Sequence, residues 1–348
     1  MTQPQTSFDV DAAAQQLIAL MAADSTSGRE EPAINAAETI AARLGFASMR
    51  LPAAPGRDNL LVTPTPFTPE TAPTLVLCTH LDTVPPYIAP RLEPGVVHGR
   101  GACDAKGAAI AMIYALARAR LTLGRDPRAA CLFVVGEETD HVGARAFAAS
   151  PLFSPQHIIL GEPCGVRPAA GQKGLIKLRL TRTGKAAHSA FPELGDSAVH
   201  GLIRALDRLL AAPLPADHGA GETTLNIGQV SGGIAANVFA PEAEALVLIR
   251  CATSTDSIER TVRAALGPDI TATILNRVEP RRFGVLGQKP GDTVSFNTDA
   301  NELAPLGAEL YLLGPGDMRC AHGPHELLTL TDLEAGIAAY AEIVCALA

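Results

Sequence analysis

Short hydrophobic runs that end in acidic or histidine residues are the feature that most constrains how this chain folds. Three such runs and one glycine-rich turn share the pattern: residues 75–79 before His80 and Asp82, 99–103 before Asp104, 131–136 before Glu137 and Glu138, and 157–161 before Glu162. Open α/β sheets collect their ligands in the crevice beyond the carboxyl ends of the strands. The pattern therefore predicts one metal site, lined by nitrogen and oxygen donors, of the kind that activates water for hydrolysis.

The alternation of strands and helices predicts an α/β fold in two parts. A chain of 348 residues is longer than one hydrophobic core usually holds. Nearly continuous apolar strands between helical segments are typical of a mixed or parallel sheet covered by helices on both faces. From Gly171 onward, the expected order β-α-β-β-α-β is that of a ferredoxin-like domain. We therefore predict one domain from 1–170 and 281–348, with a second domain inserted at 171–280.

The individual elements are predicted from hydrophobic periodicity and from helix-end signals. Helices are expected at 11–22, 31–44, 106–121, 196–210, 254–265, directly after Thr298, and at 330–347. Strands are expected at 74–79, 130–136, 157–161, 175–180, 224–230, 243–250, 269–275 and 308–313. Asp196 is the expected N-cap of the helix that it begins.

Composition and charge argue against several classes of protein. The net charge is −8 and the basic residues are dispersed, which argues against a nucleic-acid partner. No apolar run approaches the ~18 residues of a membrane span, and residues 1–11 lack a basic-then-apolar signal. Seven cysteines without a CxxC pair favour a reducing compartment. We therefore expect a cytoplasmic protein that does not associate with a membrane.

Taken alone, each candidate ligand also fits a simpler role, as a loop residue after a strand or, for Asp104, as a helix N-cap. Glu137 and Glu138 are harder to explain in this way. Two adjacent carboxylates at the end of an apolar strand repel each other unless a cation lies beside them. Two further imidazoles, His322 and His325, lie close together near the C-terminus, and either one fits as the group that closes a metal site.

Seven segments, in order along nearly the whole chain, carry a resemblance to a known family: HLDTVP (80–85), GRGACDAKG (99–107), GEE (136–138), GEP (161–163), AHSAFP (187–192), GGIAANVFAP (232–241), and GPGD with AHGPHE (314–326). They resemble the dinuclear zinc amidohydrolases, a family that includes acetylornithine deacetylase, acetylcitrulline deacetylase, acetyl-lysine deacetylase, succinyl-diaminopimelate desuccinylase, aminoacylase and carboxypeptidase G. Residues 226–241 and 314–317 are most similar to the acetylornithine/acetylcitrulline/acetyl-lysine deacetylase branch. The resemblance implies a zinc-peptidase-like mixed sheet flanked by helices, with the inserted ferredoxin-like α+β domain serving as a lid and in dimerisation.

The resemblance also implies a site for two divalent ions. Zinc is the expected metal, and the same donors also accept cobalt or manganese. The implied ligands are His80 and Glu162 on one ion, Glu138 and His322 on the other, and Asp104 bridging both. His322 is preferred to His325 because the family ligand stands just ahead of an x-x-(Asn/Asp)-Glu stretch, in which His325 takes the Asn/Asp place. Three further features are implied: a hydrogen bond between His80 and Asp82, Glu137 as the general base, and a cis peptide bond between Asp104 and Ala105.

Further residues resemble the family's substrate-binding groups. His188 resembles the oxyanion donor that the neighbouring subunit supplies in this family, so a homodimer is expected. The short inserted domain also favours a dimer. The other candidates are Asn237, Arg250, Asn297, Thr298, Gly314 and Gly316. A guanidinium such as that of Arg250 binds a carboxylate through two parallel hydrogen bonds, whereas Gly314 and Gly316 equally fit a plain turn after a strand.

The activity that the resemblance implies is hydrolysis of the amide bond of an N-acyl-L-amino acid. The expected small-molecule substrates are N-acetylornithine, N-acetylcitrulline or N-acetyl-lysine, in arginine or lysine biosynthesis. Alternatives on the same fold are a succinyl-diaminopimelate desuccinylase and a dipeptidase, aminopeptidase or carboxypeptidase. A non-enzyme alternative is an inactive family member that acts as a binding module. The presence of Glu137 beside all five implied ligands argues against this last alternative.

Overall fold

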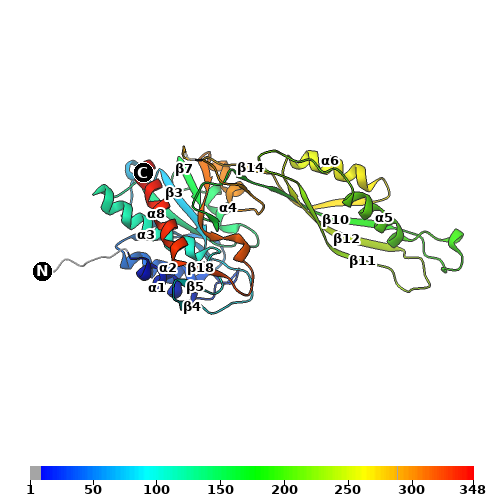
Figure 1. Ribbon diagram of the computed structural model, residues 1–348, viewed down its shortest axis with the longest axis horizontal. Helices are drawn as coiled ribbons and strands as arrows, with labels where there is room; N and C mark the ends of the chain where they lie inside the picture. Colours follow the sequence, from blue (N-terminus) through cyan, green and yellow to red (C-terminus); the bar gives the residue numbers. More distant parts are fainter. Residues whose placement is uncertain (1–8, 288) are drawn as a thin grey trace. The chain divides into compact units, whose positions relative to one another are not determined.

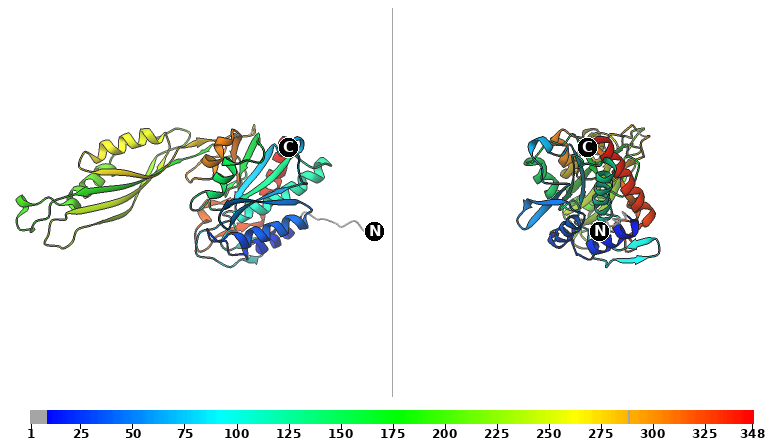
Figure 2. Two further views of the ribbon diagram at one scale, coloured as in Figure 1. Left: turned by 180° about the vertical axis from the view of Figure 1, so that it is seen from behind. Right: turned by 90° about the vertical axis from the view of Figure 1, so that its left-hand side faces the viewer.

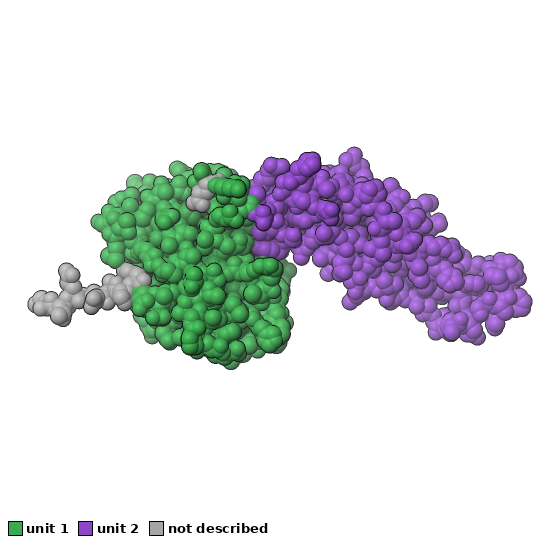
Figure 3. Space-filling view, in the orientation of Figure 1, with its two compact units in different colours: residues 1–169, 283–291, 298–348 green, residues 170–282, 292–297 purple. Residues whose placement is uncertain are grey.

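The computed structural model describes residues 9–287 and 289–348, which form two compact units. Unit 1 comprises the described residues of 1–169, 283–291 and 298–348, and unit 2 comprises residues 170–282 and 292–297 (Figure 3). The segment 292–297 lies in unit 2, whereas the sequence analysis placed it in the first domain. It belongs to unit 2 because β15 (Thr293–Val294) pairs in parallel with β9 (Gly171–Gln172).

The centre of unit 1 is a mixed six-stranded sheet, so the predicted fold class is confirmed. Its strands lie in the order β1 (Ala47–Ala54), β2 (Arg57–Thr63), β6 (Ala129–Val134), β3 (Leu75–His80), β7 (His157–Leu160) and β16 (Glu309–Leu312). The last four strands are parallel, whereas β1 and β2 form an antiparallel hairpin, which the sequence analysis did not predict. The parallel strands therefore end at one edge of the sheet, where the acidic and histidine residues follow them.

Helices bury both faces of this sheet. They are α1 (Val10–Met21), α2 (Glu31–Arg43), α3 (Lys106–Leu123), α4 (Val142–Ala149), α7 (Ala300–Leu303) and α8 (Leu330–Leu347). Leu75 and Leu77 point into one core with α1, α2, α3 and α8, and the intervening Val76 and Cys78 are also fully buried. Because successive strand residues point to opposite faces, the sheet is covered on both sides, as its apolar strands predict. The long helices α3 and α8 pack side by side (Figures 1 and 2).

Unit 2 contains a ferredoxin-like sandwich. Its elements follow in the order β10 (Gly174–Thr183), α5 (Ala198–Leu210), β11 (Thr224–Gly232), β12 (Glu242–Cys251), α6 (Thr255–Leu266) and β13 (Thr271–Val278). The sheet order is β11-β12-β10-β13, and all pairs are antiparallel. Alternate residues of β10, such as Ile176 and Leu178, form a separate apolar core with α5 and α6.

One expected helix cap in unit 2 is wrong. The sequence analysis took Asp196 as the N-cap of α5, but the cap is Ser197, whose hydroxyl accepts a hydrogen bond from the His200 amide. The Asp196 carboxylate instead accepts two hydrogen bonds from Arg182. The Asp196 carboxylate therefore binds the Arg182 guanidinium, and the adjacent Ser197 accepts the hydrogen bond from the free N–H group at the start of the helix.

The remaining elements are short. They are β4 (Arg91–Glu93), β5 (Val96–His98) and β18 (Leu327–Thr329) in one small sheet, β8 (Cys164–Gly165) paired with β17 (Gly314–Asp317), β14 (Arg281–Arg282) paired with β9, and the 3-10 turns η1 (Pro69–Thr71), η2 (Pro192–Leu194), η3 (Ala304–Leu306) and η4 (Met318–Cys320). The helices described within 9–287 and 289–348 include none that combines the length and the apolar character needed to cross a membrane.

Candidate metal centre

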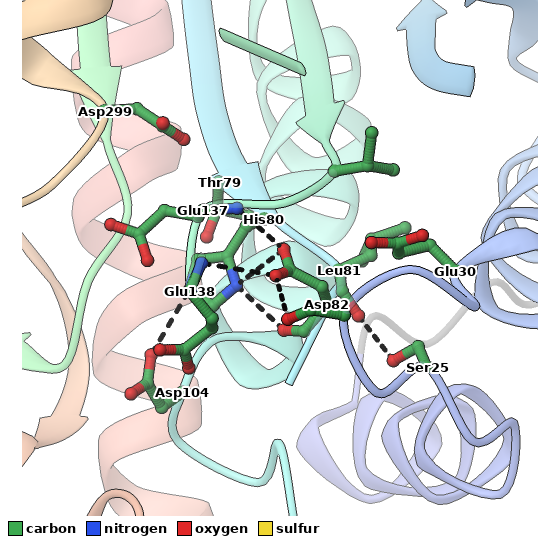
Figure 4. A network of polar contacts seen from close by, with 12 residues as sticks. Ser25, Glu30, Thr79, His80, Leu81, Asp82, Asp104, Glu137, Glu138 and Asp299 are labelled. Carbon is green, nitrogen blue, oxygen red and sulfur yellow. Dashed lines mark hydrogen bonds and ion pairs between the residues drawn. The ribbon is translucent and has the colours of Figure 1, made fainter. Parts of the chain in front are cut away.

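Three neighbouring parallel strands deliver candidate ligands to the same edge of the unit 1 sheet. His80 is the last residue of β3, Glu137 and Glu138 follow β6, and Glu162 follows β7. Figure 4 shows His80, Glu138 and Asp104 pointing toward one another. One ligand atom from each of these three side chains lies within 4.8 Å of the other two. Strand ends separated along the sequence are thus brought into one cluster by the parallel pairing.

Asp104 lies between the two candidate imidazoles. Its Oδ1 is 3.2 Å from His80 Nε2, and its Oδ2 is 3.1 Å from His322 Nε2. The residue is only 4% exposed and sits in the loop before α3. The cis peptide between Asp104 and Ala105 that the resemblance implies is present. Each carboxylate oxygen of Asp104 therefore faces a different imidazole nitrogen.

The other two carboxylates divide between these imidazoles. Glu162 Oε2 is 3.9 Å from His80 Nε2, whereas Glu138 Oε1 is 3.0 Å from His322 Nε2. The cluster thus has two halves, each with one imidazole and one glutamate, and the halves share Asp104. His322 is the imidazole that reaches the cluster, while His325 is exposed in the following turn.

The Asp82 carboxylate organises the loop that carries Glu137 and Glu138. Oδ1 accepts a hydrogen bond from the Glu137 amide at 3.1 Å, and Oδ2 accepts from the Glu138 amide at 3.2 Å and from Ser27 Oγ at 2.7 Å. The expected partner, His80, is 3.6 Å from this carboxylate through Nδ1. The same Nδ1 is 2.9 Å from the backbone carbonyl of Asp82. Asp82 therefore contacts His80 mainly through its backbone, because its carboxylate is already shared among three donors.

The hydrogen bond at His80 Nδ1 fixes the orientation of the ring. When Nδ1–H donates to the Asp82 carbonyl, Nε2 carries the lone pair, and Nε2 is the atom that faces Asp104 and Glu162. Metal-binding histidines almost always have such a partner on the nitrogen that does not bind the metal. The local geometry of His80 therefore fits a ligand.

Burial and mutual repulsion shift the protonation of the carboxylates in the cluster. Burial, followed by the charge of Glu162, raises the pKa of Glu137 well above its ordinary value. The pKa of Glu162 is raised mainly by burial as well. Hydrogen bonds with Asp104 and Glu138 raise the pKa of His322 to about 10. A pair of divalent cations bound here would neutralise the same negative charge.

The donor set fits a pair of divalent ions. Imidazole nitrogens and carboxylate oxygens are ligands that zinc accepts, and cobalt or manganese also binds to them. His80, Glu162 and Asp104 Oδ1 would hold one ion, and His322, Glu138 and Asp104 Oδ2 would hold the other. The four carboxylates of the cluster, Glu137 included, are at most about one-tenth exposed. Buried acidic groups at this density need compensating positive charge.

The remaining candidates of unit 1 support the cluster or lie close to it. Gly314 is packed so closely against the backbone of Glu162 that a side chain there would push on its carbonyl oxygen. Gly316 has a φ of +97°, which explains a glycine in this turn. Thr298 is buried, and its hydroxyl accepts a hydrogen bond from the Ala300 amide, which steadies the turn that leads into α7.

The candidates of unit 2 form two local groups. His188 forms an isolated bridge with Val238, and the Ser189 amide donates to the Asn237 carbonyl, so two segments far apart in sequence lie side by side. His188 Nδ1 accepts a hydrogen bond from the Ala190 amide at 3.1 Å. Its Nε2 therefore carries the proton in the neutral ring, and among the described residues it has no hydrogen-bond partner.

Arg250 lies near the end of β12, on a different part of unit 2. It is partly buried, and desolvation lowers its pKa. Within the described part of the chain, no carboxylate forms a salt bridge with its guanidinium. Asn297 is also partly buried, and its Oδ1 has no hydrogen-bond partner in the described structure.

The sequence analysis missed several residues that hold the cluster in place. Besides Ser27 they are Arg100, Glu326, His141 and Asp299. Arg100 and Glu326 form a fully buried ion pair, and His141 Nδ1 lies 2.8 Å from Asp299 Oδ1 and 4.0 Å from Glu137 Oε1. Arg100 and Glu326 stand inside the segments that carry the family resemblance. That location was the only sequence signal for them, because their partners are distant in the chain.

Comparisons with known proteins agree on one family. Residues 76–346 match the model of peptidase family M20/M25/M40. A probable carboxypeptidase of Aspergillus niger is 36% identical over 326 residues, which cover 83% of this chain and 77% of the fungal protein. A peptidase M20 domain-containing protein of Schizosaccharomyces pombe is 34% identical over 274 residues, which cover 78% of this chain and 68% of that protein.

Solved structures share the fold at lower sequence identity. An aminopeptidase of Bacillus cereus superposes with a TM-score of 0.78 at 20% identity, covering 97% of this chain and 99% of the other. A metallo-carboxypeptidase of the M20 family from Sulfolobus solfataricus gives a TM-score of 0.69 at 15% identity, covering 96% and 98%. These structures support the mixed α/β architecture described above.

Proposed function

Because the chain belongs to peptidase family M20/M25/M40, we propose that it is a metal-dependent hydrolase that releases a C-terminal amino acid from a small peptide or acyl-peptide. The observation that carries the proposal is the position of Asp104, whose two carboxylate oxygens face His80 and His322. A carboxylate between two imidazole–glutamate pairs is suited to bridge two divalent ions. When bound, such ions polarise the scissile carbonyl and make water more acidic.

The proposal assigns the proton transfers to Glu137. Burial raises the pKa of this carboxyl above its ordinary value, which makes its carboxylate a stronger base than that of an exposed glutamate. Its backbone amide is held by Asp82, which keeps the carboxylate at the rim of the cluster. Glu137 would accept a proton from the attacking water and then donate it to the amine that leaves. Glu138, held by the other oxygen of Asp82, is assigned to the metal.

The proposed substrate has a free carboxylate beside the amide that is cleaved. Support comes from Arg250, whose partly buried guanidinium has no carboxylate partner in the described structure. A buried guanidinium of this kind favours an anionic ligand. Asn237 and Asn297 are proposed as further polar contacts with the substrate, and Gly314 and Gly316 as residues that keep its path open. His188, with a free Nε2–H, is proposed as the donor to the oxyanion, supplied by the partner subunit of a homodimer.

Two versions of this activity differ only in the acyl group. The Aspergillus relatives are named probable carboxypeptidases, which favours a peptidyl group for this chain. A second candidate is an N-acetyl-amino-acid deacetylase, because residues 226–241 and 314–317 resemble that branch. Both activities cut the amide on the amino side of a residue that bears a free carboxylate. Zinc is proposed as the native metal.

The test combines one variant with a matched set of substrates. The zinc-loaded protein should hydrolyse N-acyl amino acids or dipeptides and should act poorly on the same compounds with an amidated C-terminus. Glu137→Gln should retain its zinc and lose at least about 100-fold in kcat, because the general base is missing. The ratio of peptidyl to N-acetyl turnover separates the two versions. Full activity of Glu137→Gln, or equal rates on amidated substrates, would contradict the proposal.

A further inference from the structure

A buried ion pair connects the two loops that carry Asp104 and His322. Arg100 is 2% exposed and Glu326 is 1% exposed, and Arg100 Nη1 donates to Glu326 Oε2 at 2.6 Å. Arg100 follows β5 and Glu326 precedes β18, two strands that pair in antiparallel register. The Gly99 amide continues this pairing by donating to the Glu326 carbonyl at 3.0 Å. The strand pairing therefore places the two charges opposite each other.

Glu326 binds the backbone of the loop that leads to Asp104. Its Oε1 accepts hydrogen bonds from the amides of Gly101 at 2.9 Å, Cys103 at 3.3 Å and Asp104 at 3.2 Å. A carboxylate that accepts several backbone N–H groups fixes a loop strongly, because these bonds are charge-assisted. The position of the Asp104 backbone thus depends directly on Glu326.

Arg100 binds the backbone of the turn that carries His322. Its Nη2 donates to the His322 carbonyl at 3.3 Å, and its Nη1 also donates to the Gly323 carbonyl at 3.3 Å. The His322 side chain is 51% exposed, and its φ is +62°, a conformation that few non-glycine residues adopt. Side-chain packing therefore contributes little to holding this imidazole, and the guanidinium behind it supplies two contacts.

We propose that Arg100 and Glu326 are positioning residues that set the distance between Asp104 and His322, and thereby the affinity of the half-site formed by His322, Glu138 and Asp104 for a divalent ion. The inference rests on the proposed function, because it requires that this half-site binds metal. The inference predicts that cutting the contacts between Arg100 and the His322 turn lowers the affinity for the ion of this half-site more than the affinity for the other ion. The ion held by His80 and Glu162, both buried on strand ends, depends less on the turn.

The discriminating variant is Arg100→Lys. Lysine keeps the positive charge beside Glu326, but its single ammonium group lacks the planar fork that reaches two carbonyls. The link from Glu326 to Asp104 therefore stays, while the link to His322 is cut. Arg118→Lys is the matched control, because Arg118 pairs with Glu334 between α3 and α8. His322→Ala provides the reference for a protein that lacks a ligand of this half-site.

The measurement is calorimetric titration of the metal-free protein with zinc ions, with thermal melting as a check on folding. The wild type and Arg118→Lys should bind two equivalents. Arg100→Lys should keep one equivalent at wild-type affinity and lose at least about 10-fold in affinity for the second, as changes behind a metal ligand typically do. Its curve should approach that of His322→Ala. Glu326→Gln, which keeps the shape and removes the charge, should lower the affinity for both ions, because it loosens the loop that carries the shared ligand Asp104.

The alternative outcomes are distinguishable. Two equivalents of unchanged affinity in Arg100→Lys would overturn the inference while leaving the proposed function intact. Loss of cooperative melting in Arg100→Lys and Glu326→Gln, with Arg118→Lys still folded, would also overturn it, since the pair would then serve stability. Absence of zinc binding by the wild type would instead reject the proposed function.

Discussion

At the residue scale, a single donor is assigned to the oxyanion. Replacing His188 by alanine should lower kcat about 100- to 1000-fold, because an oxyanion donor acts mainly in the transition state. Zinc content should not change, because His188 lies in unit 2 and is not among the proposed ligands. His200→Ala is the control, since His200 is another exposed imidazole of the same unit. Steady-state kinetics check the prediction, and a kcat for His188→Ala within about a factor of two of wild type would contradict it.

The same scale shows which site residues the sequence reveals. His80, Glu138 and Glu162 follow apolar strands, so local pattern places them at one sheet edge. Arg100 and Glu326 have no such signal. They are 226 positions apart, and only the pairing of β5 with β18 brings them together. A buried partner of this kind is set by tertiary contacts, which local periodicity does not encode.

At the element scale, the start of α3 is packed against the loop that carries Asp104. A side chain at Gly107 would clash with the Ala102 carbonyl and with the Leu328 side chain. Gly107→Ala should therefore destabilise the protein by about 1–3 kcal/mol through overpacking, and it should weaken zinc binding by shifting the Asp104 loop. The control is Gly228→Ala in β11, where the nearest atom to an added Cβ is 3.7 Å away. Thermal melting measures both, and equal melting temperatures would refute the packing argument.

Element prediction succeeded for the central helix and the parallel strands of unit 1 but missed a hairpin and a small helix. The buried helix α3 and the parallel strands β3, β6 and β7 were predicted within a few residues. The β1–β2 hairpin was missed because only β2 is buried, while β1 is mostly half-exposed. The small helix α4 was missed as well. Its eight residues give fewer than three turns over which a period can be detected.

At the scale of the whole molecule, the sequence predicted two parts, and for the inserted part the predicted order β-α-β-β-α-β matches β10, α5, β11, β12, α6 and β13. The segment 292–297 was misplaced because the pairing of β15 with β9 joins strands of only two residues. Loop side chains that select a substrate follow no hydrophobic pattern, so the sequence does not specify the acyl group.

The central claim is that Asp104 joins two divalent ions in one site. Crystals grown with zinc and measured on both sides of the zinc absorption edge test it most directly. The account predicts two anomalous peaks, one beside each carboxylate oxygen of Asp104, the first next to His80 and Glu162 and the second next to His322 and Glu138. Zinc bound elsewhere, or Asp104 turned away from both imidazoles with no peak between them, would contradict it.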